Sequence, residues 1–211
     1  MLARWIRTWD SKILRPLLLL IHKGGLTPNM LTVSGLIVMV ISGVQLARGD
    51  WLVGGLILLI GALLDGIDGE LARLTQSETG MGALLDSLSD HCGDFALYLG
   101  LLWFSLARQL EGNIILILVA LFGSTFGSLV RSRAGMLGID TKDIGLFTRF
   151  ERILILLLGL FLDKLTPALC VLAVFNNFSA FQRVHHVFRL LFSLQKSHKR
   201  DDPRYALGNK D

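Results

Sequence analysis

Residues 65–90 read DGIDGELARLTQSETGMGALLDSLSD, and the rest of the chain is organised around them. Two apolar runs flank this stretch, and four aspartates stand inside it: Asp65, Asp68, Asp86 and Asp90. The first two are three residues apart and the last two are four apart, so each pair lies on one face of a helix. The polar turn between the runs predicts two antiparallel neighbouring helices, whose acidic faces can meet.

Aspartates inside such apolar runs require cations. An ionised aspartate in a bilayer costs roughly 2.5 to 3.5 kcal/mol on insertion scales, and four like charges repel one another as well. Mg²⁺ prefers carboxylate oxygens together with substrate phosphates. Two such ions form a clamp for displacement at phosphorus. The sequence therefore predicts a site for two divalent ions, Mg²⁺ or Mn²⁺, that acts on a phosphate compound.

The same stretch resembles the signature of a known family, the CDP-alcohol phosphotransferases. The matching pattern is Asp65-x2-Asp68-Gly69-x2-Ala72-Arg73-x8-Gly82-x3-Asp86-x3-Asp90. Members are integral membrane enzymes that form the headgroup bonds of phospholipids. The resemblance implies that all four aspartates bind metal and that Asp90 is also the general base. It further implies a CDP-lipid site formed by Asp65, Gly69, Ala72, Arg73 and Gly82.

The composition of the chain is that of a membrane protein. It has 211 residues, of which 52% are hydrophobic and only 18% are charged. Six apolar segments each reach, or nearly reach, the ~20 residues that a spanning helix needs; they cover about 28–47, 51–73, 82–107, 112–133, 146–163 and 166–192. We therefore expect an all-α polytopic integral membrane protein, with one domain of six transmembrane helices at residues 24–195.

Basic residues indicate the orientation of these segments. With both termini in the cytoplasm, only Arg48, Arg108 and Lys164 fall in the three opposite loops, as the positive-inside rule requires. Both termini and the active site are then expected at the cytoplasmic face of the cell membrane. The net charge of +4 comes from clusters near the proposed membrane boundaries, which favours anionic lipids and phosphate substrates over nucleic acid.

The two ends of the chain differ from the domain between them. Residues 1–23 combine Trp5 and Trp9 with several basic side chains, which predicts an amphipathic helix lying in the membrane interface. The sequence Thr27-Pro28-Asn29 then favours a helix start. Residues 196–211 are polar and lack apolar periodicity, so a flexible cytoplasmic tail is expected there.

A second group of charged residues lies beyond the aspartates. Arg131, Arg133, Arg149 and Arg152 bracket a short cytoplasmic linker, and Arg183 lies near the cytoplasmic end of the last segment. Such arginines can be simple topology markers that snorkel to lipid headgroups. As a group, they could instead hold a phosphate through bidentate contacts.

The segments around these arginines resemble the phosphatidylinositol phosphate synthase branch of the family. They read RSRA, GLFTRFER and FQRVHH, and the resemblance implies that Arg131, Arg152 and Arg183 bind the phosphate of the acceptor. Two positions depart from that branch, which commonly has lysine at Arg131 and proline at Phe150. Ser87 and His91 differ from the phosphatidylglycerol phosphate synthase branch, which argues against glycerol 3-phosphate.

The predicted reaction transfers a phosphatidyl-type group from a CDP-linked lipid, diacyl or diether, to inositol phosphate and releases CMP in phospholipid biosynthesis. Glycerol 3-phosphate or another acceptor is the alternative with the same chemistry. A cation transporter or an intramembrane prenyltransferase is the alternative of another class. The partners are the CDP-linked lipid, a soluble alcohol phosphate and membrane lipids. The resemblance also implies a homodimer, whereas the small-residue face of Gly123 and Gly127 favours close helix packing.

Overall fold

The computed structural model describes residues 16, 18–21, 23–141, 144–145 and 147–201, with side chains as far as residue 193. This part of the chain is all-helical, as predicted, and contains no strand. Its long helices are α2 (Pro28–Arg48), α3 (Trp51–Leu74), α4 (Gly80–Ala107), α5 (Glu111–Met136), α6 (Arg149–Phe161) and α7 (Leu165–Asp201). The interfacial helix predicted for residues 1–23 falls mostly outside the described residues, and so does the tail beyond Asp201.

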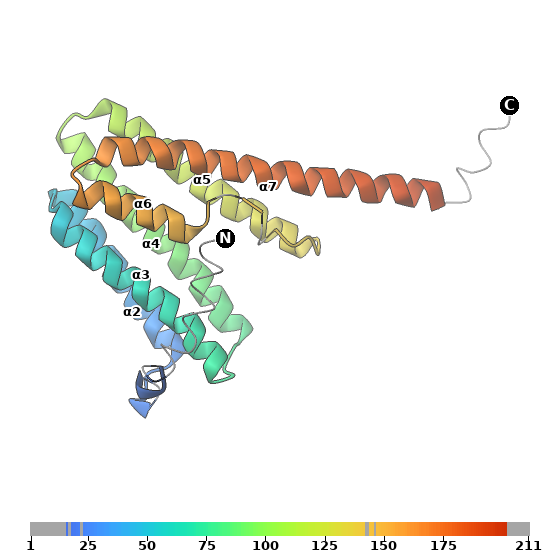
Figure 1. The fold of residues 1–211 in the computed structure, drawn as a ribbon, viewed down its shortest axis with the longest axis horizontal. Helices are drawn as coiled ribbons and strands as arrows, with labels where there is room; N and C mark the ends of the chain where they lie inside the picture. The colour runs from blue at the N-terminus through green and yellow to red at the C-terminus, as the bar shows by residue number, and fades with distance from the viewer. Residues whose placement is uncertain (1–15, 17, 22, 142–143, 146, 202–211) are drawn as a thin grey trace.

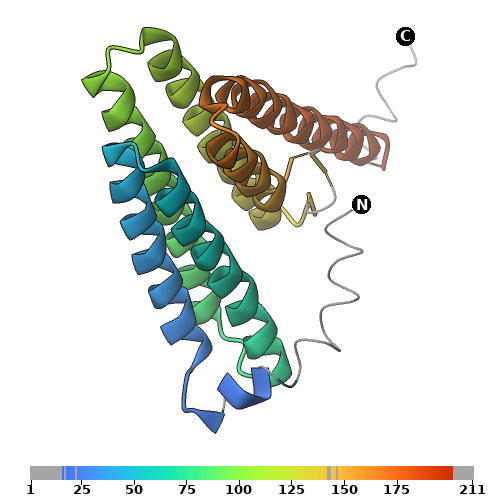
Figure 2. The same ribbon diagram turned by 60° about the vertical axis from the view of Figure 1, so that its left-hand side comes forward.

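The helices form two groups of three (Figures 1 and 2). In the first group α2 packs against both α3 and α4, and in the second α7 packs against α5 and α6. Contacts of α4 with α5 and of α3 with α6 join the groups. The sequence predicts that α3 and α4 are direct neighbours, but α2 takes most of the contacts of both helices. The predicted meeting of the acidic faces is nevertheless confirmed for Asp65 of α3 and Asp86 and Asp90 of α4, whose carboxylates lie close together.

One apolar core connects all six helices. Its members include Met39 of α2, Leu58 of α3, Leu101 of α4 and Ile117 of α5, each at most 2% exposed. By contrast, many large apolar side chains point outward, among them Phe122 at 62% exposure. Exposing this much apolar surface to water is unfavourable, whereas contact of the same surface with the acyl chains of a bilayer is favourable.

Within the part of the chain that the structure describes, four helices are long and apolar enough to cross a membrane: α2, α3, α5 and α7 up to Ser193. Helix α4 has 28 residues, but its first half carries the aspartates. Helix α6 has only 13 residues, where the sequence predicts a segment of 146–163. At 1.5 Å per residue, it is ~20 Å long and shorter than a ~30 Å hydrocarbon core.

Local caps explain where the helices near the aspartates begin. The Thr27 hydroxyl accepts a hydrogen bond from the Met30 amide at 3.3 Å, and Pro28 takes the first helical position of α2. The Thr79 hydroxyl accepts one from the Gly82 amide at 3.0 Å at the start of α4. Ser, Thr, Asp and Asn are preferred at this position because their oxygens satisfy free amides. The helix start predicted at Thr27-Pro28 is confirmed.

Glycines allow close backbone contact between helices. A Cβ atom on Gly43 of α2 would clash with the Ala96 carbonyl of α4, and one on Gly100 of α4 would clash with the Gly43 carbonyl. In the second group, a Cβ on Gly123 of α5 would meet Asn177 of α7. The small-residue face of α5 therefore serves packing within the chain, as predicted.

We expect Gly43→Ala to destabilise the protein. The added methyl would meet backbone atoms, which cannot move aside as a side chain can, so the cost should be roughly 1 to 3 kcal/mol or more. Thermal unfolding in detergent would show a lower Tm. Gly112→Ala on α5 is the matched control, because its Cβ would meet nothing within 4 Å. Equal Tm values for the two variants would contradict the close α2–α4 contact.

Candidate active site

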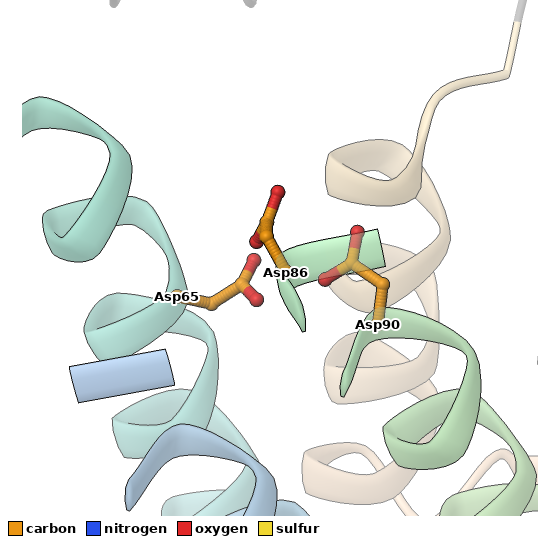
Figure 3. A group of neighbouring side chains, drawn as sticks. All are labelled: Asp65, Asp86 and Asp90. Atoms are coloured by element: carbon orange, nitrogen blue, oxygen red, sulfur yellow. The ribbon is translucent and has the colours of Figure 1, made fainter. Parts of the chain in front are cut away.

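Three of the four predicted aspartates meet at one point. Asp65 of α3 faces Asp86 and Asp90 of α4, and Figure 3 shows the three carboxylates turned toward a common centre. One oxygen from each lies within 4.8 Å of the other two. Oxygen donors in this number are what a hard divalent cation requires, with its other positions left to substrate phosphate or water. The residues present therefore fit the predicted metal.

Asp68 lies apart from this group. Its side chain is buried at 4% exposure, and the Thr32 hydroxyl of α2 donates a hydrogen bond of 2.5 Å to its Oδ2. The prediction that Asp65 and Asp68 point into one site is not met, because Asp68 turns toward α2 to pair with Thr32. The structure thus assembles Asp65, Asp86 and Asp90, whereas the metal-binding role of Asp68 stays a prediction.

An arginine occupies the space between the carboxylates. The Arg149 Nη1 donates to Asp65 Oδ2 at 2.6 Å and also to Asp90 Oδ1. Arg149 is the first residue of α6, and a capping box between Thr148 and Glu151 fixes that start. Like charges at this distance are unfavourable without a counter-ion, and the guanidinium supplies one. Arg149 thus supplies a counter-charge to Asp65 and Asp90.

A first cavity, of about 200 Å³, opens between α2, α3 and the start of α4. Among its lining residues are four of the five residues predicted for the CDP-linked lipid: Gly69, Ala72, Arg73 and Gly82. Asp65 is not part of its wall, whereas Asp68 and Asp86 are. Helix α2 adds Asn29 and Thr32, which the sequence reading did not assign. A Cβ on Gly82 would lie 3.3 Å from Asn29 Oδ1, so glycine keeps this wall open.

A second cavity, of about 660 Å³, is bounded by residues of α4, α5, α6 and α7. All three arginines predicted for the acceptor line it, and so do Asp86 and Asp90; the arginines are Arg131, Arg152 and Arg183. Arg149 is a fourth arginine in the same wall. Because Asp86 lines both cavities, the two adjoin at the carboxylates. An anion in the second cavity would therefore lie beside the metal-binding group.

Arg183 also stabilises the fold around this cavity. Its guanidinium donates to three backbone carbonyls: Ile144 at 3.0 Å, Gly127 at 3.1 Å and Phe147 at 3.5 Å. The residue is buried at 8% exposure. These bonds tie α7 to α5 and to the linker before α6. Arg183 thus helps to position the segment that carries Arg149 and Arg152.

We expect Arg183→Lys to lower both stability and activity. Lysine keeps the charge, but its single ammonium cannot reproduce the planar fork that reaches three carbonyls. Loss of hydrogen bonds from a charged group costs roughly 1.5 to 3 kcal/mol. Thermal unfolding of the variant in detergent checks this expectation, with Arg131→Lys as the matched control because Arg131 is exposed. A wild-type Tm for Arg183→Lys would contradict the structural role of Arg183 and leave only its role in binding the acceptor.

Sequence reasoning missed two charged residues of this site. Arg149 was noted as one of several cytoplasmic arginines, but nothing local separates it from its neighbours. Asp94 follows Asp90 by four residues, so it shares the face of the other aspartates on α4, and this spacing was a usable signal. It lines the second cavity with them.

Comparison with known proteins agrees with this geometry. Residues 25–194 match the model of the CDP-alcohol phosphatidyltransferase family. An archaetidylinositol phosphate synthase of Pyrococcus horikoshii is 30% identical over 167 residues, which cover 79% of this chain and 86% of the relative. A phosphatidylinositol phosphate synthase of Mycolicibacterium smegmatis is 32% identical over 187 residues, which cover 83% and 84%.

A solved structure shows the same fold. The crystal structure of the Mycobacterium tuberculosis phosphatidylinositol phosphate synthase with CDP-DAG bound superposes with a TM-score of 0.77 at 28% identity, covering 84% of this chain and 94% of that one. A second structure of that protein, in complex with manganese and citrate, gives a TM-score of 0.74 at 29% identity, covering 82% and 88%.

Proposed function

This chain belongs to the CDP-alcohol phosphatidyltransferase family, and we propose that it transfers the phosphatidyl-type group of a CDP-linked lipid to inositol phosphate, with release of CMP. The observation that supports inositol phosphate as the acceptor is the lining of the second cavity, where arginines from three helices lie near Asp86 and Asp90. A free alcohol needs no such set of cations, whereas an alcohol that carries a phosphate does. The names of the relatives support the same acceptor.

The first cavity is the proposed site of the CDP-linked lipid. It is smaller than the second cavity, and one arginine stands among the described residues of its wall, Arg73, whose side chain is 52% exposed. Exposure leaves that guanidinium free to turn from its partner Glu70 toward a diphosphate. The Mycobacterium tuberculosis relative has been solved with CDP-DAG bound, which supports a CDP-linked lipid here.

In the proposed reaction, Asp90 accepts the proton of the acceptor hydroxyl. The hydroxyl oxygen forms a bond to the lipid-side phosphorus, and the bond from that phosphorus to the bridging oxygen of CMP breaks. Asp65, Asp86 and Asp90, together with Asp68, would hold the divalent cations. Bound there, two such ions would stabilise charge on the attacking and leaving oxygens. A relative has been solved in complex with manganese, which supports a divalent cation in this chain as well.

The membrane arrangement extends this proposal. Four helices have the length and apolarity to span, and we place α4 and α6 among them to give six crossings within residues 24–195. The carboxylates then open to the cytoplasm, where soluble inositol phosphate is available, while the lipid tails stay in the bilayer of the cell membrane. The protein works as a homodimer. The interfacial helix expected for residues 1–23 and the end of the tail expected for residues 196–211 lie mostly outside the described residues and stay predictions. Helix α7 extends through residues 196–201.

Release of CMP from CDP-diacylglycerol tests the function. Purified protein with Mg²⁺ would be offered inositol 1-phosphate, inositol, glycerol 3-phosphate and serine separately, with a diether CDP-lipid in parallel. We expect release with inositol 1-phosphate alone. Release with glycerol 3-phosphate instead would retain the aspartate chemistry and overturn the acceptor. No CMP release with either lipid and any acceptor would contradict the transferase and favour a cation transporter.

A further inference from the structure

Asp94 extends the row of aspartates on α4 into the protein. Asp86, Asp90 and Asp94 follow one another at intervals of four residues and line the second cavity together. Burial increases along the row, because the side chain of Asp90 is 34% exposed and that of Asp94 only 12%. Asp94 therefore lies at the base of the cavity, one helical turn beyond the proposed general base.

The Asp94 carboxylate contacts two arginines of α6. Arg152 Nη2 donates to Asp94 Oδ2 at 3.1 Å, and Arg149 Nε lies 3.5 Å from Asp94 Oδ1. The Ser124 hydroxyl of α5 also donates to Oδ2 at 3.1 Å, which fixes the carboxylate itself. Three helices thus meet at one buried anion. The Asp94 carboxylate holds the two arginines, which are three residues apart on α6, on the same side of the cavity.

We infer that Asp94 is a positioning residue for the acceptor phosphate, acting through Arg152. The inference rests on the proposed function and adds a residue to it that lies outside the sequence pattern of the family. A guanidinium held at one edge by a carboxylate keeps its remaining N–H groups in a fixed direction, which a free arginine side chain does not. Without Asp94, Arg149 and Arg152 would repel one another and lose their common partner.

Whether acceptor binding weakens or strengthens when Asp94 is replaced distinguishes a positioning role from an effect of net charge alone. Removal of a negative group from a cavity that binds an anion should strengthen binding if only net charge counts. If orientation decides, the same change should weaken it, although the cavity becomes more positive. Asp94→Ala should then raise the KM for the acceptor roughly 10- to 100-fold, the equivalent of about one charged hydrogen bond. The KM for the CDP-linked lipid, which binds in the other cavity, should stay unchanged.

A double-mutant cycle tests the inference. CMP release would be measured for Asp94→Ala, Arg152→Ala and the variant with both substitutions, at varied inositol 1-phosphate. If Asp94 acts through Arg152, the double variant should have nearly the acceptor KM of Arg152→Ala alone. Additive effects, or a KM for Asp94→Ala that is equal to or below that of wild type, would overturn it. If the alanine variant does not fold, Asp94→Leu takes its place, because leucine has a similar shape and no hydrogen-bond acceptor for Ser124 or Arg152.

Binding of inorganic phosphate separates failure of the inference from failure of the proposed function. Calorimetric titration of phosphate into the wild type and Asp94→Ala needs no turnover, so it measures the effect of Asp94 on anion binding whatever the natural acceptor is. We expect weaker phosphate binding by the variant. Equal or tighter binding, or no binding by the wild type, would overturn the inference. A wild type that binds phosphate but releases no CMP would overturn the proposed function alone.

Discussion

Asp90→Asn should abolish turnover and leave the fold intact. Asparagine has nearly the same shape, and its amide oxygen can still accept the hydrogen bond from Arg149, but it cannot take a proton from the acceptor hydroxyl. Loss of a general base costs roughly 10²- to 10⁴-fold in rate. CMP release at saturating lipid and acceptor measures the effect on kcat, and circular dichroism with thermal unfolding checks the fold.

The control for this prediction is Asp163→Asn. Asp163 follows the end of α6, far along the chain from the carboxylates, and its backbone has a φ of 53°, which asparagine also tolerates. This variant should keep wild-type activity. A folded Asp90→Asn enzyme with more than about a tenth of wild-type kcat would refute Asp90 as the general base, since the expected loss is at least ~10²-fold.

Asp86→Asn should lose activity because the metal binds more weakly. Asp86 belongs to the three-carboxylate group and lines both cavities, so it lies where the two substrates would meet. Even second-layer partners of metal ligands are worth roughly 10- to 100-fold in metal affinity, and a direct ligand should be worth no less. Activity at fixed Mg²⁺ should fall by at least this factor, and added metal should recover part of it.

Metal binding measures the loss at Asp86 directly. Titration of Mn²⁺ into metal-free protein, followed by electron paramagnetic resonance, should show weaker binding by Asp86→Asn than by the wild type. Asp86 is exposed, so the substitution should leave the Tm of the metal-free protein nearly unchanged. Wild-type Mn²⁺ affinity in Asp86→Asn would remove this residue from the metal site.

Much of the fold follows from local sequence, and the exceptions have identifiable causes. The predicted start of α2 is confirmed because Thr27 and Pro28 form a cap that depends on no distant contact. The segment predicted at 146–163 is longer than α6, because apolarity alone does not mark the helix start. Thr148 and Glu151 form the capping box that does mark it, and their spacing was legible in the sequence.

The site was predictable where neighbours in sequence are neighbours in space. The four-residue spacing of Asp86 and Asp90 predicts that they lie on one face of α4. Asp65 joins them because α3 passes close to that face. Asp68 depends on α2, whose Thr32 draws its carboxylate away from the group. Arg149 depends on the packing of α6 against α3, 84 residues away from Asp65 in the chain. A single sequence carries no local sign of such contacts.

Identification of the lipid product would test the central claim most directly. Purified protein would be incubated with CDP-diacylglycerol, Mg²⁺ and inositol 1-phosphate, and the lipids would be identified by mass spectrometry while CMP is quantified. We predict one new lipid, phosphatidylinositol phosphate, formed in equal amount to CMP and absent with Asp90→Asn. Phosphatidic acid in place of that lipid would show that water is the acceptor and would contradict the proposed transfer between the two cavities.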